Sequence, residues 1–403
     1  MKKSPVDAVT SITSRAKASM MVALLASLAC QMTSASDAAT HPAPPHASPF
    51  PPQIQLNVPF APTAFPGEDG EHLLYELQVT NFENTPITLD HVDILNAIHT
   101  DTAPLASFAG HLLNNIVRLA GADDVTDTGN VAKPININAG ATAVLFLSVT
   151  APSKAAMPER VVQRVAFTNG EVVEGAAVGT HSSTLKVLGA PVVGTDWIGD
   201  DGPSNAADNH HRRGIFVVDG NMTISRRFAI DWKQMEQGLP YHGDIHADRS
   251  YYAYDKPVLA VATATVVYVR DGLPDNPPGH FPNFHPARPV TFDNAGGNTI
   301  VLDLGDGQFA HYYHLKAGTI QVKKGQRVNI GDVIAHVGAS GDAREPHLHF
   351  EVTTAIPLLV GEGIPYVIDH FKVIGGEGHS PGVRRNETPL DGMLVDFENG
   401  GRD

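Results

Sequence analysis

Two histidines separated by one residue, His347 and His349, lie in the segment EPHLHFEV at residues 345–352. Because side chains alternate along a strand, both imidazoles and Glu351 would share one face, and the intervening apolar residues would face a core. Two neighbouring imidazoles can bind a metal ion or transfer protons. Glu351 would either orient one of these imidazoles or stand as an ordinary strand carboxylate. The segment is therefore a candidate site, with a plain polar strand face as the alternative.

A second pair of histidines lies in FAHYYHLK, residues 309–316, which follows a predicted hairpin turn at Gly305-Asp306-Gly307. Strand alternation predicts His314 on one face and His311 and Tyr313 on the other.

A separate cluster, YHGDIHAD at residues 241–248, places histidine and aspartate at alternate positions. Alone it looks like a metal site, because these side chains would line one face of a strand. Few apolar residues are present to bury the opposite face, so we expect an exposed insertion here. The four residues are His242, Asp244, His246 and Asp248.

The sequence HYYHLKAGTIQVKKGQRVNIGDVIAHVGASGDAREPHLHFEV resembles the C-terminal half of lysostaphin/LytM-type zinc metallopeptidases, which cut peptide cross-links in bacterial cell walls. The shared motifs are His-Leu, Val-x-x-Gly, Gly-Asp-Val-Ile, Gly-x-Ser-Gly and Pro-His-Leu-His-Phe, in the family's order. The resemblance extends over about residues 205–355. It implies an exported zinc-dependent endopeptidase that hydrolyses peptide bonds in peptidoglycan.

The resemblance also implies roles for individual residues. His349 and Asp231, the latter in RFAIDW, fall at positions of the family's zinc ligands, and His314 and His347 fall at its two catalytic histidines. Two imidazoles and one carboxylate form a normal ligand set for a catalytic zinc ion. Two further imidazoles would handle protons and the developing oxyanion.

The first zinc ligand departs from the family pattern, because Arg227 stands where a histidine usually precedes the aspartate by four residues. We expect His211 of NHHRR to replace it, with His210 as the other possibility. A hairpin turning at Asp219-Gly220 would bring either imidazole across from the strand that carries Asp231. Arg227 would then face the substrate and bind a carboxylate of an acidic stem peptide.

Short strand-like segments separated by turns predict an all-β fold. We expect an immunoglobulin-like β-sandwich followed by an antiparallel β-sheet or barrel-like metallopeptidase domain. The expected divisions are a signal peptide at 1–35, a Pro/Ala-rich linker at 36–53, the sandwich at 54–190, the LytM-type zinc peptidase domain at 191–376, and a loose tail at 377–403.

The formal net charge of −15 argues against nucleic acid as the main partner. Basic residues precede the apolar run ASMMVALLASLA, which is too short to span a bilayer comfortably and reads as a secretory signal ending near Ala35. Cys30, the one cysteine, allows a lipoprotein anchor as a second interpretation. We therefore expect a periplasmic or extracellular protein with no membrane span in the mature chain.

Two other classes of function compete with the enzyme. A catalytically degenerate LytM-like domain would bind cell wall or regulate a partner hydrolase, and Arg227 favours this alternative. A biotinyl- or lipoyl-type carrier barrel has a turn rhythm similar to VKKGQRVNIGDVI, but Lys323 and Lys324 precede the strand rather than occupying a hairpin tip.

Export is directly testable. The mature protein should begin near Ser36, because small residues around Ala35 form a cleavage site for signal peptidase. Mass spectrometry of the exported protein would measure its N-terminus. A diacylated N-terminal Cys30 would show that the lipoprotein interpretation is the correct one.

Overall fold

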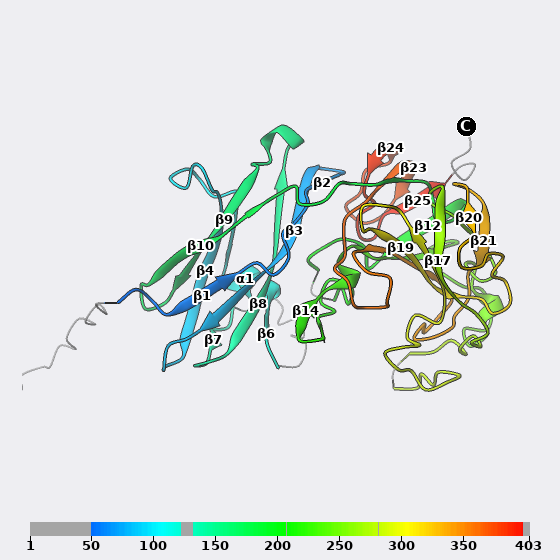
Figure 1. Ribbon diagram of the computed structural model, residues 1–403, viewed down its shortest axis with the longest axis horizontal. Helices are drawn as coiled ribbons and strands as arrows, with labels where there is room; N and C mark the ends of the chain where they lie inside the picture. The colour runs from blue at the N-terminus through cyan, green and yellow to red at the C-terminus, as the bar shows by residue number, and fades with distance from the viewer. Residues whose placement is uncertain (1–49, 122–131, 207, 281, 398–403) are drawn as a thin grey trace, which may run out of the picture. The chain divides into compact units, whose positions relative to one another are not determined.

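Alternating apolar residues after residue 54 form strands in two five-stranded sheets of a β-sandwich (Figure 1). The computed structural model describes residues 50–121, 132–206, 208–280 and 282–397. The predicted signal peptide, Cys30 and most of the predicted linker lie outside these residues. One sheet contains β1 (Ile54–Asn57), β2 (Phe65–Gly67), β3 (Gly70–Asn81), β6 (Val117–Leu119) and β8 (Thr142–Ala151). The other contains β4 (Ile87–Asn96), β5 (Ala106–Ala109), β7 (Ile135–Ile137), β9 (Arg160–Phe167) and β10 (Val172–Gly179).

The two sheets of the sandwich share one hydrophobic core. Leu73, Leu77 and Leu145 from the first sheet pack in the same cluster as Val92 and Val165 from the second. A short helix, α1 (Gly110–Ile116), and a 3₁₀ turn, η1 (Lys154–Ala156), lie between strands. Residues 180–186 form a connection between β10 and the next strand along the chain.

The second part of the chain forms an eleven-stranded, mainly antiparallel sheet with the order β11-β23-β25-β12-β15-β22-β19-β18-β17-β20, and β24 pairs with β23. The predicted all-β fold class is therefore confirmed. The strands are β11 (Val187–Leu188), β12 (Gly194–Asp200), β15 (Ile230–Gln234), β17 (Ala264–Arg270), β18 (Asn298–Asp303), β19 (Phe309–Leu315), β20 (Arg327–Val328), β22 (Leu348–Thr353), β23 (Val367–Gly375), β24 (Gly382–Glu387) and β25 (Leu394–Phe397).

The C-terminal segment is not a loose tail, as far as the described residues extend. β25 lies beside β12 and β23 and pairs with both (Figure 1). Its Phe397 packs edge-on against Trp232 of β15 at a ring separation of 5.1 Å. The charged and glycine-containing composition suggested an unpacked end. The strand nevertheless forms because its apolar residues complete the core of the large sheet.

The predicted hairpin turn at Asp219-Gly220 is present, but it joins only a short ribbon, β13 (Phe216–Val218) with β14 (Asn221–Thr223). The 3₁₀ turn η2 (Ser225–Phe228) follows and separates this ribbon from β15. In the segment 256–269, β16 (Pro257–Leu259) pairs with β21 (Val333–His336) and not with β17. A further 3₁₀ turn, η3, spans Asp248–Ser250.

A buried ion network links strand β3 to two segments of the peptidase region. Glu76 is 1% exposed and contacts the guanidinium of Arg212, which is fully buried. The Nε of Arg227, in η2, donates to both carboxylate oxygens of Glu76 at 3.1 and 2.9 Å. Arg227 also forms an ion pair with Glu362 at 3.0 Å. One carboxylate of the sandwich thus holds two arginines that flank Asp231 and His211.

Replacing Glu76 with Gln should destabilise the protein by about 3–5 kcal/mol, because two buried guanidinium groups would lose their shared counter-charge. Denaturant unfolding measures this loss. Glu174→Gln is the matched control, since it removes an Arg-paired carboxylate at the surface and should cost no more than about 1 kcal/mol. Equal effects of the two substitutions would contradict the importance assigned to burial.

Candidate metal centre

Adjacent strands of the large sheet place an acid and an imidazole opposite each other. Asp231 on β15 is the register partner of His349 on β22, and Tyr313 on β19 is the next partner of His349. Residues directly opposite in antiparallel strands point to the same face. The apolar residues of β22 face the core, as the alternation predicts, so His349 faces the cleft. His347, which precedes the strand, also lines the cleft.

His211 reaches this face from a loop. It lies in a turn after β12, and its Nδ1 is 3.0 Å from the backbone oxygen of Asp201. The side chain is 1% exposed, and its Nε2 lies 3.4 Å from Oδ1 of Asp231. The expected cross-strand hairpin was therefore wrong in its geometry, although His211 does face Asp231. Arg212, clamped by Glu76, is the next residue and fixes the turn.

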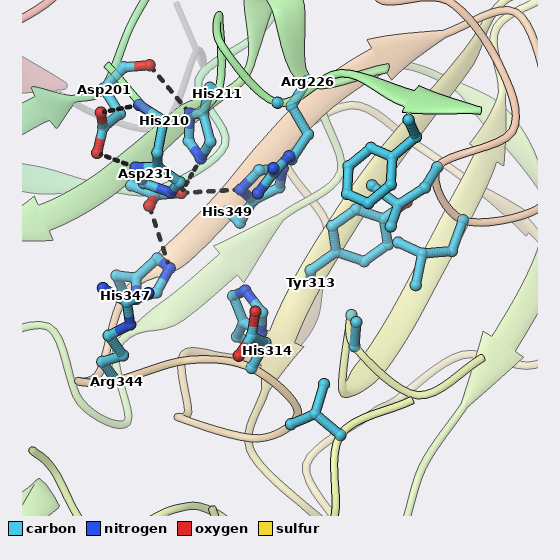
Figure 2. A pocket seen from close by; sticks show the side chains of 18 of the residues that line it. Asp201, His210, His211, Arg226, Asp231, Tyr313, His314, Arg344, His347 and His349 are labelled. Carbon is cyan, nitrogen blue, oxygen red and sulfur yellow. Dashed lines mark hydrogen bonds and ion pairs between the residues drawn. The ribbon is translucent and has the colours of Figure 1, made fainter. Parts of the chain in front are cut away.

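Asp231 is the centre of the cluster (Figure 2). Its Oδ1 is 2.9 Å from Nδ1 of His349, and its Oδ2 is 3.4 Å from Nε2 of His347. The ring of His314 lies 4.9 Å from that of His347 and 6.0 Å from that of His349. The structure thus brings together all five predicted site residues: His211, Asp231, His314, His347 and His349.

Backbone oxygens orient three of the imidazoles. The Nδ1 atoms of His211, His314 and His347 lie 3.0, 2.8 and 2.8 Å from the carbonyl oxygens of Asp201, Ser340 and Glu345. A carbonyl oxygen can only accept, so each Nδ1 carries the proton and donates it. The lone pair of each neutral imidazole is then on Nε2.

His314 adopts an unusual backbone conformation, with φ of 60° in the left-handed region. This conformation interrupts the alternation of β19, so both Tyr313 and His314 line the cleft while Tyr312 and Leu315 enter the core. The prediction that His314 and Tyr313 face opposite sides was therefore wrong. Strained backbone at a non-glycine residue costs about 1–3 kcal/mol and persists only when the surroundings enforce it.

The electrostatics of the cluster favour positive charge beside Asp231. Burial opposes ionisation of Asp231, but His347 and His211 outweigh it and hold the pKa of the carboxyl well below its usual value. Burial alone would lower the pKa of His349, but its contacts with Asp231 and Glu351 raise it to about 9. Burial lowers the pKa of His211 and His314 well below the usual value.

A divalent metal ion fits this donor set. The Nε2 of His211 is buried without a hydrogen-bond partner and faces Asp231, as expected of a metal-ligating nitrogen. Candidate ligand atoms of His210, His211 and Asp231 lie within 4.8 Å of one another. The side chain of His210 is half exposed and its Nδ1 pairs with Asp201 at 2.8 Å. The buried His211 is therefore the better ligand.

Glu351 lies behind His349, away from solvent. It is fully buried, and its Oε2 is 3.4 Å from Nε2 of His349. This contact favours the proton of His349 on Nε2 and leaves Nδ1 directed at Asp231. Of the two roles considered for Glu351, the geometry supports the orienting one.

Arg227 does not face the substrate. It is 3% exposed and pairs with Glu76 and Glu362, so the expectation that it binds a substrate carboxylate was wrong. The adjacent Arg226 lines the cleft instead. A 3₁₀ turn separates consecutive side chains by about 120°, which explains why neighbouring arginines point in different directions.

The cleft above the cluster has a volume of about 740 Å³ and is open to one side. Phe216, Phe292 and Leu359 contribute apolar lining, and Lys233 and Arg226 contribute positive charge. Sequence reasoning missed Arg226, which belongs to no recognisable motif, and placed Tyr313 on the wrong face of its strand. The segment of residues 241–248 lies largely exposed, as expected, and has no metal-ligand group among the described residues.

Residues 249–358 match the model of peptidase family M23. This match confirms, over those residues, the resemblance of the sequence to lysostaphin/LytM-type enzymes.

Several solved structures are similar to this chain. The catalytic domain of lysostaphin from Staphylococcus simulans is 19% identical, with 37% of this chain and 80% of that chain covered and a TM-score of 0.22. A mutant catalytic domain of a prophage-encoded M23 protein from Enterococcus faecalis is 18% identical, covering 45% and 92%, with a TM-score of 0.25. A zinc-containing peptidase from Vibrio cholerae is 16% identical, covering 73% and 79%, also at 0.25.

Replacing His211, Asp231 or His349 with Ala should each lower zinc affinity by at least about a hundredfold, since loss of an orienting group alone costs about 10- to 100-fold. Competition with a chromophoric chelator measures this affinity. His210→Ala is the matched control and should bind zinc nearly as well as the unmodified protein. If His211→Ala bound zinc normally and His210→Ala lost zinc affinity, His210 would be the zinc ligand in place of His211.

Proposed function

We propose that the protein is an exported, zinc-dependent metalloendopeptidase that hydrolyses peptide bonds in bacterial cell-wall peptidoglycan. One observation carries the proposal. Three candidate zinc ligands meet at the floor of an open cleft, and two oriented imidazoles lie beside them; the residues are His211, Asp231, His349, His314 and His347. The match of residues 249–358 to peptidase family M23 supports the reaction class.

The proposed metal ion would be zinc, held by His211, Asp231 and His349. When bound, zinc would polarise the scissile carbonyl and lower the pKa of the attacking water. Nitrogen and carboxylate donors of this kind are usual for catalytic zinc.

His314 and His347 would transfer protons. Both donate Nδ1–H to a backbone carbonyl, so the basic Nε2 of each is available to the substrate side. Such a nitrogen can accept the proton of the attacking water and return it to the amine nitrogen of the departing peptide. Once protonated, the same imidazole can stabilise negative charge on the carbonyl oxygen.

The cleft suits a peptide substrate. Its apolar rim can contact side chains of an extended chain, while its charged residues can bind peptide carboxylates or amines. Peptidoglycan peptides are the proposed substrate because wall peptides are the substrates that the lysostaphin/LytM resemblance implies.

A periplasmic or extracellular location is part of the proposal. The basic and then apolar N-terminal sequence supports export. Among the described residues, no helix is long and apolar enough to cross a membrane.

A catalytically degenerate domain that binds cell wall or regulates a hydrolase is the second candidate. Arg227 was the feature that favoured it. In the structure Arg227 is engaged by Glu76, and His211 faces Asp231 from the loop after β12. The substitution at position 227 therefore gives no support to a lost metal site.

Replacing His314 or His347 with Ala should lower turnover of purified muropeptides by about 10²- to 10⁴-fold, the usual contribution of a general acid or base. Both variants should keep zinc, because neither residue is a proposed ligand. Mass spectrometry of the digestion products measures turnover. The exposed His242 supplies the control, since His242→Ala should cleave normally. Undiminished turnover in both site variants would refute the roles, and a zinc-loaded unmodified protein that cleaves no wall peptide would favour the degenerate alternative.

A further inference from the structure

Arg226 lies in the cleft but is neither a proposed metal ligand nor a proposed proton-transfer residue. It is the second residue of η2 and lies in the cleft lining with Asp231, His349 and Tyr313 (Figure 2). Its neighbour Arg227 is buried against Glu76, so the turn is anchored on one side and presents Arg226 on the other. The position of Arg226 is therefore set by the fold.

The guanidinium of Arg226 is held in place by an aromatic side chain. Its Cζ lies 5.5 Å from the ring centroid of Phe216, and Phe216 packs edge-on against Phe292 at 6.5 Å. Cation–π contact of this kind leaves the edge of the guanidinium plane, with its N–H donors, free for a ligand. The absence of a Cβ at Gly214 also makes room, since a methyl group there would lie 2.4 Å from Nη2 of Arg226.

Arg226 makes no direct ion pair with any residue that the structure describes, and its Nε is buried without a hydrogen-bond partner. Its charge acts on the carboxyls of Glu351 and Asp342 and favours their ionised forms. Lys233 in the same cleft differs, because it pairs with Asp200 at 2.6 Å and Glu345 at 2.7 Å. A partly buried guanidinium with an unsatisfied donor is costly unless a ligand completes it.

Arg226 is also close enough to the reacting groups to act on the same substrate molecule. It lines the same cleft as Asp231, Tyr313 and His349 (Figure 2). Tyr313 is the register partner of His349, whose Nδ1 contacts Asp231. A substrate bound at the metal centre would thus extend past Arg226.

We propose that Arg226 binds a free carboxylate of the peptide substrate and makes the site selective for acidic peptides. The proposal rests on the proposed peptidase function. Arginine suits this role because its planar group can donate two parallel hydrogen bonds to one carboxylate. An amide in place of the carboxylate has no negative charge and turns one acceptor into a donor, so it cannot satisfy the guanidinium equally well.

The test uses two synthetic wall peptides that are identical except that one glutamyl carboxylate is free in the first and amidated in the second. The zinc-loaded unmodified protein should cleave the free acid with the higher kcat/KM. Arg226→Gln should lower kcat/KM for the free acid by about 10- to 100-fold, the range expected for a lost charge-assisted hydrogen bond, and change cleavage of the amide little. Most of the loss should appear in KM.

Two further variants separate this role from a structural one. Arg226→Lys keeps the charge but not the fork of donors, so it should restore part of the preference for the acid. Arg385→Gln removes the same type of charge from an exposed position on β24 outside the cleft lining and should leave the preference unchanged. Zinc content and circular dichroism establish that each variant is folded.

Binding of the same two peptides to the metal-free protein, measured by calorimetry, distinguishes failure of this inference from failure of the proposed function. Preferential binding of the acid, lost in Arg226→Gln, would support the inference even if no cleavage occurred. The inference would be overturned if the unmodified protein and Arg226→Gln showed the same acid-to-amide ratio of binding affinity and the same acid-to-amide ratio of kcat/KM.

Discussion

The candidate site depends most on the ion pairs that the buried carboxylate of Glu76 makes with two arginines. It belongs to strand β3 of the sandwich, yet it contacts Arg212 beside His211 and Arg227 four residues before Asp231. Charges this deeply buried are tolerated only when paired and well hydrogen-bonded.

The same network gives the N-terminal sandwich a structural part in the site. Arg212 also donates to the backbone oxygens of Tyr75 and Leu147, at 3.1 and 3.3 Å, on neighbouring strands of the sandwich. Asn205, in the loop that carries His211, donates to the backbone oxygen of Phe146 at 2.7 Å. The loop that carries His211 is therefore held by the sandwich as well as by the peptidase sheet.

Backbone carbonyls orient the histidines, as Glu76 holds the loop that carries His211. Three Nδ1 atoms donate to main-chain oxygens, and the oxygens come from a turn after β12, a loop before β22 and the glycine-rich segment at Ser340. A backbone carbonyl does not titrate, so it favours the same tautomer of the neutral imidazole at any pH. A carboxylate acceptor titrates, so its effect on the tautomer depends on pH. Among the four histidines assigned to the site, His349 differs, because the carboxylate of Glu351 orients it.

Much of this protein could be predicted from its sequence. The period-two pattern of EPHLHFEV put His347 and His349 on one face, and the turn at Gly305-Asp306-Gly307 closed a real hairpin. Local spacing is sufficient there because alternation is a property of any strand with one buried face. The all-β class and the M23 resemblance follow from signals of the same local kind.

Other features were decided only by the tertiary structure. The left-handed His314 breaks the alternation of its own strand, and His211 arrives from a loop and not from a paired strand. Arg227 is turned inward by Glu76, some 150 residues earlier in the chain, which leaves Arg226 to face the cleft. The physical reason is tertiary contact. Glu76 holds both Arg227 and the Arg212 that follows His211, and the backbone oxygen of Ser340 accepts from His314. Such contacts leave no periodic pattern for local reasoning to detect.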